Sequence, residues 1–203
     1  LADPGQKLDV AKAHPEVLQK LSAAFADWFQ EVSDAGFEPI PIPVGHPKEA
    51  VTSIPANESF LQPEAGKGIN YSGSGHNGFA NSWIEDWTDP KAAAVWHLEV
   101  LTPGTYAVSM QYTCAKADVG CEVQASVADQ KLTATISKAH DPPLIGNQDR
   151  IDQSENYMRK EWTTLKLGTL KLKQGRCDLT LTGLKKVGPN MIEVKAIEMI
   201  RLP

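Results

Sequence analysis

The fold is decided by residues 94–113, AVWHLEVLTPGTYAVSMQYT, where apolar and polar side chains alternate on both sides of a Pro-Gly pair. Successive side chains of a β-strand point to opposite faces, so a period of two places every second residue on one face. The apolar faces carry Trp96, Leu98 and Val100 before the pair, and Tyr106, Val108, Met110 and Tyr112 after it. The segment therefore predicts two strands, each with one apolar face, separated by a turn at Pro103-Gly104.

The same alternation continues towards the C-terminus. Further apolar faces are formed by Val123, Ala125 and Val127, by Leu132, Ala134 and Ile136, by Leu165 and Leu167, by Leu170 and Leu172, by Leu179 and Leu181, and by Ile192, Val194 and Ala196. Because about eight such strands cannot bury their faces in a single sheet, we expect a mainly β chain folded as an antiparallel β-sandwich. No β-α-β pattern is present, which excludes a parallel sheet with its usual nucleotide site.

One amphipathic helix is expected before the sandwich, over residues 14–35. Pro15 suits the first helical position and Gly36 suits the end of the helix. The helix carries an apolar stripe at steps of three and four, formed by Leu18, Leu21, Phe25, Trp28 and Val32. Five large apolar side chains are costly to leave in water, so we expect this stripe to dock on the sandwich, on another copy of the chain or on a missing partner.

Three regions follow from these patterns. Residues 1–36 form the helical segment, and residues 37–67 are expected to be a linker with irregular extended pieces, because prolines alternate at positions 39, 41 and 43. Residues 68–203 form the sandwich. The stretch 138–160 lacks periodicity and is long for a sandwich loop, so it is either a functional loop or a crossover between the sheets.

Composition limits the partners. The 203 residues carry a net charge of −5 and no basic stripe, which argues against a nucleic acid or an anionic membrane surface. The longest uncharged run, residues 68–84, is rich in Gly, Ser and Asn, so no membrane span is expected. The sequence begins at Leu1 rather than Met, and we expect the chain to be part of a larger protein.

Three cysteines and five histidines show no metal-ligand spacing, so no metal site of the zinc type is expected. Cys114 and Cys121 flank a short segment that we interpret as the turn of a hairpin, and both fall on inward faces. A cross-hairpin disulfide and two buried thiols are both compatible with this pattern. Cys177 alternates with Leu179 and is expected to be unpaired in the core.

The acidic and aromatic segment WIEDWTDP, residues 83–90, is the best candidate for a ligand site. Flat aromatic faces and carboxylates suit the C–H faces and hydroxyl groups of sugars. The candidate ligand-binding residues are Tyr71, His76, Trp83, Asp86, Trp87 and Asp89. The alternative is that the tryptophans cover the core, as is expected for Trp96 and Trp162. Glu85, Asp86 and Asp89 could also hold a structural calcium ion, although no EF-hand spacing supports it and no other cofactor is expected.

No catalytic residues are assigned. The sequence has no Gly-x-Ser-x-Gly motif and no carboxylate pair that stands out, so an independent hydrolase is the weakest of the functional interpretations.

Two stretches carry a family resemblance. DPGQKLDVA (residues 3–11) and HPEVL (residues 14–18), followed by Trp28 and Phe29, resemble the C-terminal end of the catalytic domain of bacterial type I sulfatases. The region from Tyr112 to Gly120 and the stretch AHDPPLIG (residues 139–146) look like β-sandwich modules appended to such enzymes, which are similar to carbohydrate-binding modules of jelly-roll type.

The resemblance implies the non-catalytic C-terminal part of an exported sulfatase, and hence an extracytoplasmic location. The Cys/Ser-x-Pro-x-Arg motif of the sulfatase nucleophile is absent, so the chain itself is not expected to be an enzyme. Its expected partners are an upstream catalytic domain of the same protein and a polysaccharide, which the resemblance implies to be sulfated. Two functions remain open, namely carbohydrate binding or substrate positioning, and a structural domain that completes the catalytic core.

Overall fold

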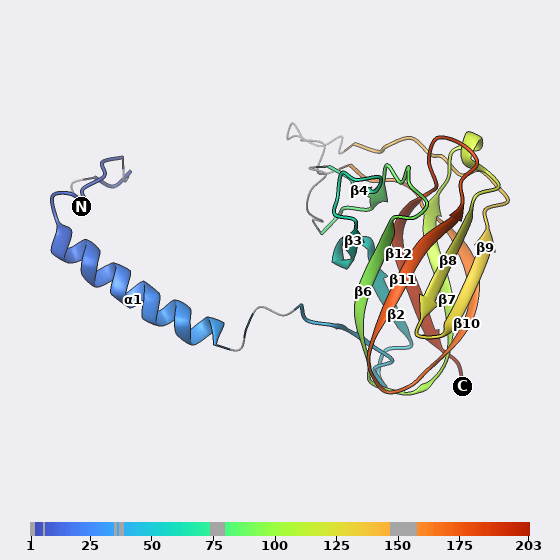
Figure 1. Ribbon diagram of the computed structural model, residues 1–203, viewed down its shortest axis with the longest axis horizontal. Coiled ribbons are helices and arrows are strands. Elements are labelled where there is room, and N and C mark those ends of the chain that lie inside the picture. Colours follow the sequence, from blue (N-terminus) through green and yellow to red (C-terminus); the bar gives the residue numbers. More distant parts are fainter. Residues whose placement is uncertain (1–2, 6, 35, 37–38, 74–79, 147–157) are drawn as a thin grey trace. The chain divides into compact units, whose positions relative to one another are not determined.

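The computed structural model describes residues 3–5, 7–34, 36, 39–73, 80–146 and 158–203 (Figure 1). The chain divides into two compact units, Leu1–Pro39 and Ile40–Pro203. Each unit is described by itself below.

The first unit contains the expected helix, α1, over Pro15–Ser33. Pro15 occupies its first turn, and Gly36 follows the helix at a φ of 80°, where its N–H bonds to the carbonyl oxygen of Ser33 at 2.8 Å. No residue of α1 is buried: the stripe residues Leu18, Leu21, Phe25, Trp28 and Val32 are 50–63% exposed. Within its own unit none of the described residues covers this stripe, and its docking on the sandwich, on another copy of the chain or on a missing partner stays a prediction.

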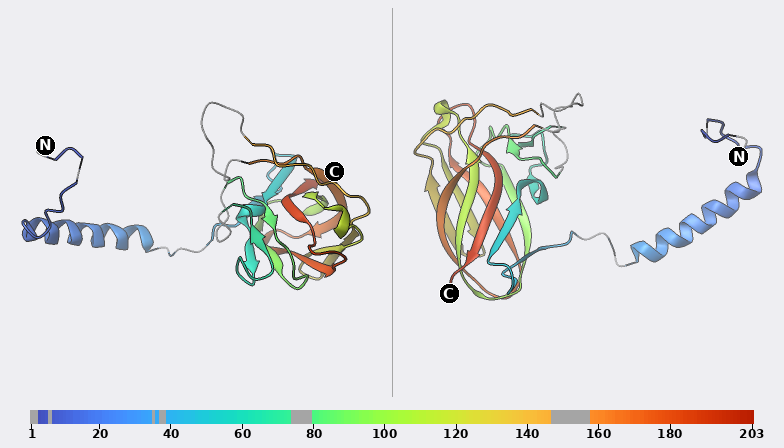
Figure 2. Two further views of the ribbon diagram at one scale, coloured as in Figure 1. Left: turned by 90° about the horizontal axis from the view of Figure 1, so that it is seen from above. Right: turned by 180° about the vertical axis from the view of Figure 1, so that it is seen from behind.

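The second unit is a sandwich of two six-stranded sheets, as the alternation predicted (Figure 2). The first sheet has the order β1-β6-β11-β8-β9, with β3 also paired to β6. Its strands are β1 (Ile42–Val44), β3 (Phe60–Gln62), β6 (Ala93–Val100), β8 (Glu122–Val127), β9 (Gln130–Thr135) and β11 (Gly175–Lys185).

The second sheet has the order β10-β7-β12-β5-β4, with β2 also paired to β12. Its strands are β2 (Val51–Pro55), β4 (Asn70–Tyr71), β5 (Ile84–Glu85), β7 (Gly104–Thr113), β10 (Thr163–Leu172) and β12 (Glu193–Arg201). Neighbouring strands are antiparallel except for β1 and β6, which are parallel. Two short 3-10 helices interrupt the loops, η1 (Ala56–Glu58) and η2 (Lys116–Asp118).

The core lies between the sheets and is formed by the predicted faces. Trp96, Leu98, Tyr106, Met110, Leu179 and Leu181 are all fully buried there. The Trp96 indole N–H donates to the Pro55 carbonyl oxygen at 2.8 Å, so a strand of the first sheet is hydrogen-bonded to β2 of the second. The Tyr106 hydroxyl group donates to the Thr102 carbonyl oxygen, so the polar tips of both Trp96 and Tyr106 have a partner.

The sandwich begins near residue 40 rather than at residue 68. Within the stretch that we expected to be a linker, β1, β2 and β3 pair with strands of the two sheets. Alternating prolines do keep this stretch extended, but an extended segment can still join the edge of a sheet. Pro43 is tolerated because β1 lies at an edge, where a missing N–H costs little.

The two ends of the sandwich differ. At one end, the connections 101–103, 128–129 and 173–174 are short turns. At the other end, which is uppermost in Figure 1, lie the longer connections 86–92, 114–121 and 186–192, together with residues 136–146 and 158–162. We call this the loop end.

Candidate functional site

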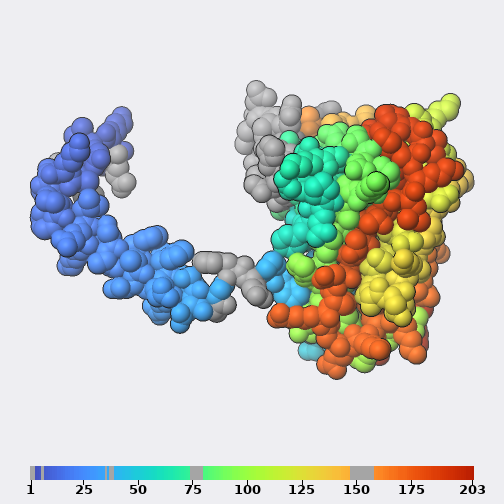
Figure 3. All heavy atoms as spheres, in the orientation of Figure 1, coloured from blue at the N-terminus to red at the C-terminus, as the bar shows by residue number. Residues whose placement is uncertain are grey.

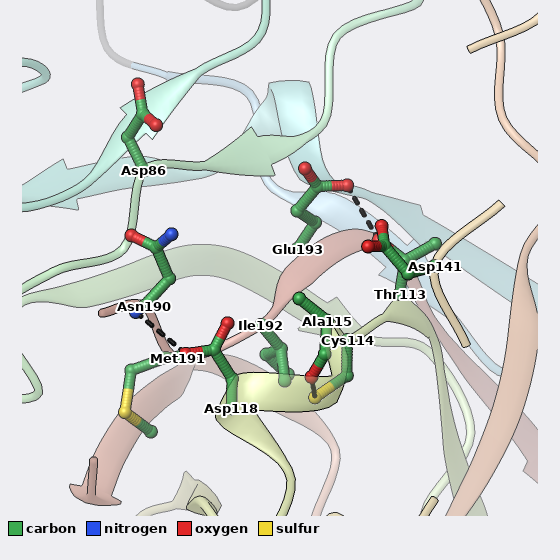
Figure 4. Close-up of a pocket in the computed structure, with 10 residues that line it drawn as sticks. All are labelled: Asp86, Thr113, Cys114, Ala115, Asp118, Asp141, Asn190, Met191, Ile192 and Glu193. Carbon is green, nitrogen blue, oxygen red and sulfur yellow. Dashed lines mark hydrogen bonds between the residues drawn. The ribbon is translucent and has the colours of Figure 1, made fainter. Parts of the chain in front are cut away.

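A pocket of about 80 Å³ opens at the loop end (Figure 4). Its walls come from segments far apart in sequence, which converge because β5, β7 and β12 are neighbours in the second sheet. The lining residues are Asp86, Thr113, Cys114, Ala115, Asp118, Asp141, Asn190, Met191, Ile192 and Glu193. Four of them carry carboxylates, and none is basic.

Asp118 fixes one wall of the pocket. This residue of η2 is only 2% exposed, and its Oδ1 accepts a hydrogen bond of 2.9 Å from the backbone N–H of Asn190. Gly188 makes the contact possible, because a Cβ at this position would lie 2.3 Å from Asp118 Oδ1 and 2.5 Å from the Ala117 carbonyl oxygen. The loops 114–121 and 186–192 are therefore packed backbone against backbone.

Glu193 fixes the opposite wall. Its carboxylate accepts a hydrogen bond of 2.6 Å from Thr113 Oγ1 and forms an ion pair with Lys160. The Lys160 Nζ also lies 5.6 Å from the ring centroid of Trp83. Lys160 therefore neutralises the carboxylate of Glu193, although Lys160 itself does not line the pocket.

Negative charge accumulates around this site. Burial raises the pKa of Glu85, at the end of β5, and the nearby charges of Glu193 and Asp86 raise it further. Asp86 takes a φ of 47°, a left-handed conformation that Asp and Asn tolerate better than most residues. In Figure 4 the side-chain amide of Asn190 points towards the backbone of Asp86, whose carboxylate points away from Asn190.

Trp83 and Trp162 pack against each other next to Lys160. Trp83 is 6% exposed, and its ring meets that of Trp162 edge to face at a centroid distance of 5.6 Å. Trp162 is half-buried, just before β10. The sequence assigned Trp162 to the core, whereas the structure leaves part of it accessible.

Of the residues predicted to bind a ligand, Asp86 alone lines the pocket among those that the structure describes. Trp87 is fully buried and donates its indole N–H to the Asp89 carbonyl oxygen at 2.9 Å. Trp83 is also buried. Trp87 therefore lies in the core, whereas Trp83 is buried against Trp162 outside the core cluster.

Of the other predicted ligand-binding residues, Tyr71 and Asp89 make hydrogen bonds within the fold, and His76 is not among the residues that the structure describes. Tyr71 is 6% exposed and donates its hydroxyl hydrogen to the Ser59 carbonyl oxygen. Asp89 Oδ1 accepts from the backbone N–H of Lys91 at 2.9 Å and so closes a local turn. His76 lies outside the described residues.

Sequence reasoning missed Thr113, Asp118, Asn190 and Glu193. No local pattern marks them, since each becomes part of the pocket through strand order. Asp141 lies in the aperiodic stretch 138–160, which was flagged as a functional loop or a crossover. That stretch connects β9 of the first sheet to β10 of the second, so it is a crossover that also contributes to the pocket.

The hairpin expected between Cys114 and Cys121 is wrong. Cys114 follows β7 of the second sheet and Cys121 precedes β8 of the first, so the segment between them crosses from one sheet to the other. Both cysteines nevertheless face the core, as expected, and both are free thiols in this structure. Cys177 is also a free thiol, partly buried against the core.

A structural calcium ion at Glu85, Asp86 and Asp89, which the sequence leaves possible, stays a prediction. Over the described ranges, no group of three or more His, Cys, Asp and Glu side chains is arranged to hold a metal ion. Within the same ranges, no helix is long and apolar enough to cross a membrane.

Comparison with known proteins gives similarity at the level of fold. No family model matches the sequence, and no curated protein is similar to it. The insecticidal crystal protein Cry2Aa is similar with a TM-score of 0.51 and 8% identity, over 77% of this chain and 22% of that one. A family 35 carbohydrate-binding module from Clostridium thermocellum has a TM-score of 0.49 and 11% identity, over 76% of this chain and 100% of the module.

A GH26-CBM35 β-(1,4)-mannanase from Podospora anserina has a TM-score of 0.46 and 10% identity, over 77% of this chain and 28% of that one. At such low identities these comparisons concern the fold alone. The sulfatase resemblance of residues 3–18 is not among them and stays a prediction.

Proposed function

We propose that the chain is a non-catalytic module that binds a carbohydrate in the loop-end pocket. The observation that carries the proposal is the pocket itself, which has a volume of about 80 Å³ and is lined by four carboxylates and one amide. Carboxylate oxygens accept hydrogen bonds from sugar hydroxyl groups, and an amide both donates and accepts. Asp86, Asn190 and Asp141 supply these groups, while Asp118 and Glu193 are already engaged in holding the walls.

The charge of the pocket selects among carbohydrates. Four lining carboxylates and no lining cation would repel a sulfate or carboxylate group on a ligand. We therefore favour an uncharged, hydroxyl-rich sugar over the sulfated polysaccharide that the family resemblance implies. Such a module raises the local concentration of substrate near an attached enzyme without chemistry of its own.

Titration calorimetry with uncharged gluco-, manno- and galacto-oligosaccharides tests this function. We expect one of them to bind, and the variant Asn190→Ala to bind it about tenfold or more weakly, because one buried hydrogen bond is worth roughly 1–3 kcal/mol. Asp141→Asn should also weaken binding. A sulfated counterpart should bind more weakly still, and added salt should improve its binding by screening the repulsion.

The matched control is Asp178→Asn, which makes the same chemical change away from the pocket. Asp178 lies on the outer face of the first sheet, where it pairs with His97 at 2.7 Å. Its replacement should leave the affinity unchanged. The proposal fails if no uncharged oligosaccharide binds at millimolar concentration, or if Asn190→Ala binds as tightly as the parent chain.

A second function is favoured by the exposed stripe of α1. Phe25 and Trp28 are 61% and 54% exposed, and the Phe25 ring lies 5.6 Å from that of Trp28 and 6.0 Å from that of Phe29 between centroids. An apolar surface of this kind marks an interaction site. Because the resemblance to sulfatases covers the same segment, we infer that α1 docks on an upstream catalytic domain of an exported, sulfatase-like protein.

Hydrogen exchange tests this docking. In the present chain the amides of residues 15–33 should exchange far faster than those of β6 and β7, since an isolated helix of this length is only marginally stable. In a longer protein that includes the upstream domain, the same amides should become protected from exchange. The double variant Phe25→Ser, Trp28→Ser should remove that protection. Strong protection of α1 in the present chain would contradict the docking model.

A further inference from the structure

Cys114 and Cys121 occupy facing positions on the two sheets. Each continues the inward face of its strand, after Tyr112 in β7 and before Val123 in β8. They are 2% and 0% exposed, respectively. The Cys114 thiol donates to the Ala115 carbonyl oxygen at 3.4 Å, and the Cys121 thiol donates to the Met191 carbonyl oxygen at 3.7 Å. The interaction between the two thiols raises the pKa of Cys114 and lowers that of Cys121.

The backbone holds both positions firmly. Cys114 exchanges two hydrogen bonds with His140, of 2.8 and 3.0 Å, and the Cys121 carbonyl oxygen accepts one of 2.9 Å from Ile136. Two buried thiols at the ends of β7 and β8, joined by the six residues 115–120 and held on backbones that are already fixed, need little rearrangement to become bonded. Cys177 lies in β11, and its pKa is raised by burial and then by Asp178, with no effect from the other two thiols.

We infer that Cys114 and Cys121 are a disulfide-forming pair that joins the two sheets beside the loop-end pocket, which Cys114 lines. A small-molecule or protein disulfide is the oxidant. One cysteine thiolate attacks it, forming a mixed disulfide and releasing one thiolate, and the second cysteine thiolate then displaces the other. The two cysteine protons leave with the released thiols, so two thiols are oxidised and one external disulfide is reduced.

A disulfide between Cys114 and Cys121 closes the loop 114–121, which forms one wall of the pocket. Between the cysteines lie Ala115, which lines the pocket, and η2 with Asp118. The crosslink therefore limits the motion of Asp118 relative to Asn190 and keeps the pocket open. This consequence rests on the proposed carbohydrate site, whereas the bond itself does not.

Refolding the full chain from urea in a mixture of reduced and oxidised glutathione gives the buried thiols access to oxidant. We expect the chain, which has three cysteines, to retain one free thiol, to lose the mass of two hydrogens, and to yield a peptide linked through Cys114 and Cys121. Closing so short a loop should raise the Tm by roughly 5–10 °C. Trypsin cleavage after the exposed Lys116 should become slower, a measure of loop rigidity that requires no sugar.

The variants Cys177→Ser and Cys121→Ala serve as controls. Cys177→Ser should form the same bond and lose the same mass, whereas Cys121→Ala should keep both of its thiols. Three free thiols in the refolded parent chain, a link that involves Cys177, or an unchanged Tm in the bonded form would each overturn the inference. None of these measurements depends on whether a carbohydrate binds.

Discussion

Replacing Gly188 with Ala is expected to lower the Tm by roughly 3–10 °C and to weaken ligand binding, although Gly188 is not a lining residue. The new Cβ would lie 2.3 Å from Asp118 Oδ1, 2.5 Å from the Ala117 carbonyl oxygen and 2.8 Å from its carbonyl carbon. Two of these neighbours are backbone atoms that cannot swing aside. The loops 114–121 and 186–192 must therefore separate, which breaks the hydrogen bond from the Asn190 backbone N–H to the Asp118 carboxylate.

Gly146→Ala is the matched control for this substitution. Its Cβ would meet only the flexible end of Met158, at 3.4 and 3.7 Å, and Gly146 does not require a positive φ. This variant should keep its stability within about 0.5 kcal/mol and its affinity unchanged. Thermal unfolding and titration of the two variants side by side check the prediction. Equal stability in both would show that the contact at Gly188 yields more easily than its backbone neighbours imply.

Replacing Trp96 with Ala is expected to have the largest effect on stability, a loss of about 3–5 kcal/mol. The indole is fully buried between the sheets, and its N–H satisfies the Pro55 carbonyl oxygen. Truncation leaves a cavity in the core and an unpaired carbonyl group at the same time. Since domains of this size are commonly stable by only 5–15 kcal/mol, much of the folding free energy would be lost.

Urea unfolding measures this loss of folding free energy as a lower urea concentration at the unfolding midpoint. Trp96→Phe separates the two causes, because it keeps most of the volume but loses the N–H, and should cost about 1–3 kcal/mol. His97→Ala is the neighbouring control on the outer face of the sheet, where the exposed pair with Asp178 is worth no more than about 1 kcal/mol. A midpoint for Trp96→Ala that matches that of His97→Ala would contradict the assignment of Trp96 to the core.

Figure 3 shows why the pocket could not be derived from the sequence, since segments 86–92 and 186–192 lie side by side at the loop end although a hundred residues separate them. The Met191 N–H donates to the Trp87 carbonyl oxygen at 2.8 Å, and the Lys186 ammonium group donates to the Thr88 carbonyl oxygen at 2.7 Å. Polar residues such as Asn190 and Glu193 carry no periodic signal. Their roles depend on which strands become neighbours.

The sequence by itself determined the strands and their inward faces, because burial on one side of a strand imposes a period of two that can be read locally. It likewise determined α1, through a period of 3.6 and a terminal glycine. Only the tertiary structure decided that residues 40–67 join the sheets, that Trp83 and Trp87 are buried, and that Cys114 and Cys121 face each other across two sheets. These outcomes depend on pairing between distant strands, and strand order is set by the packing of the whole core.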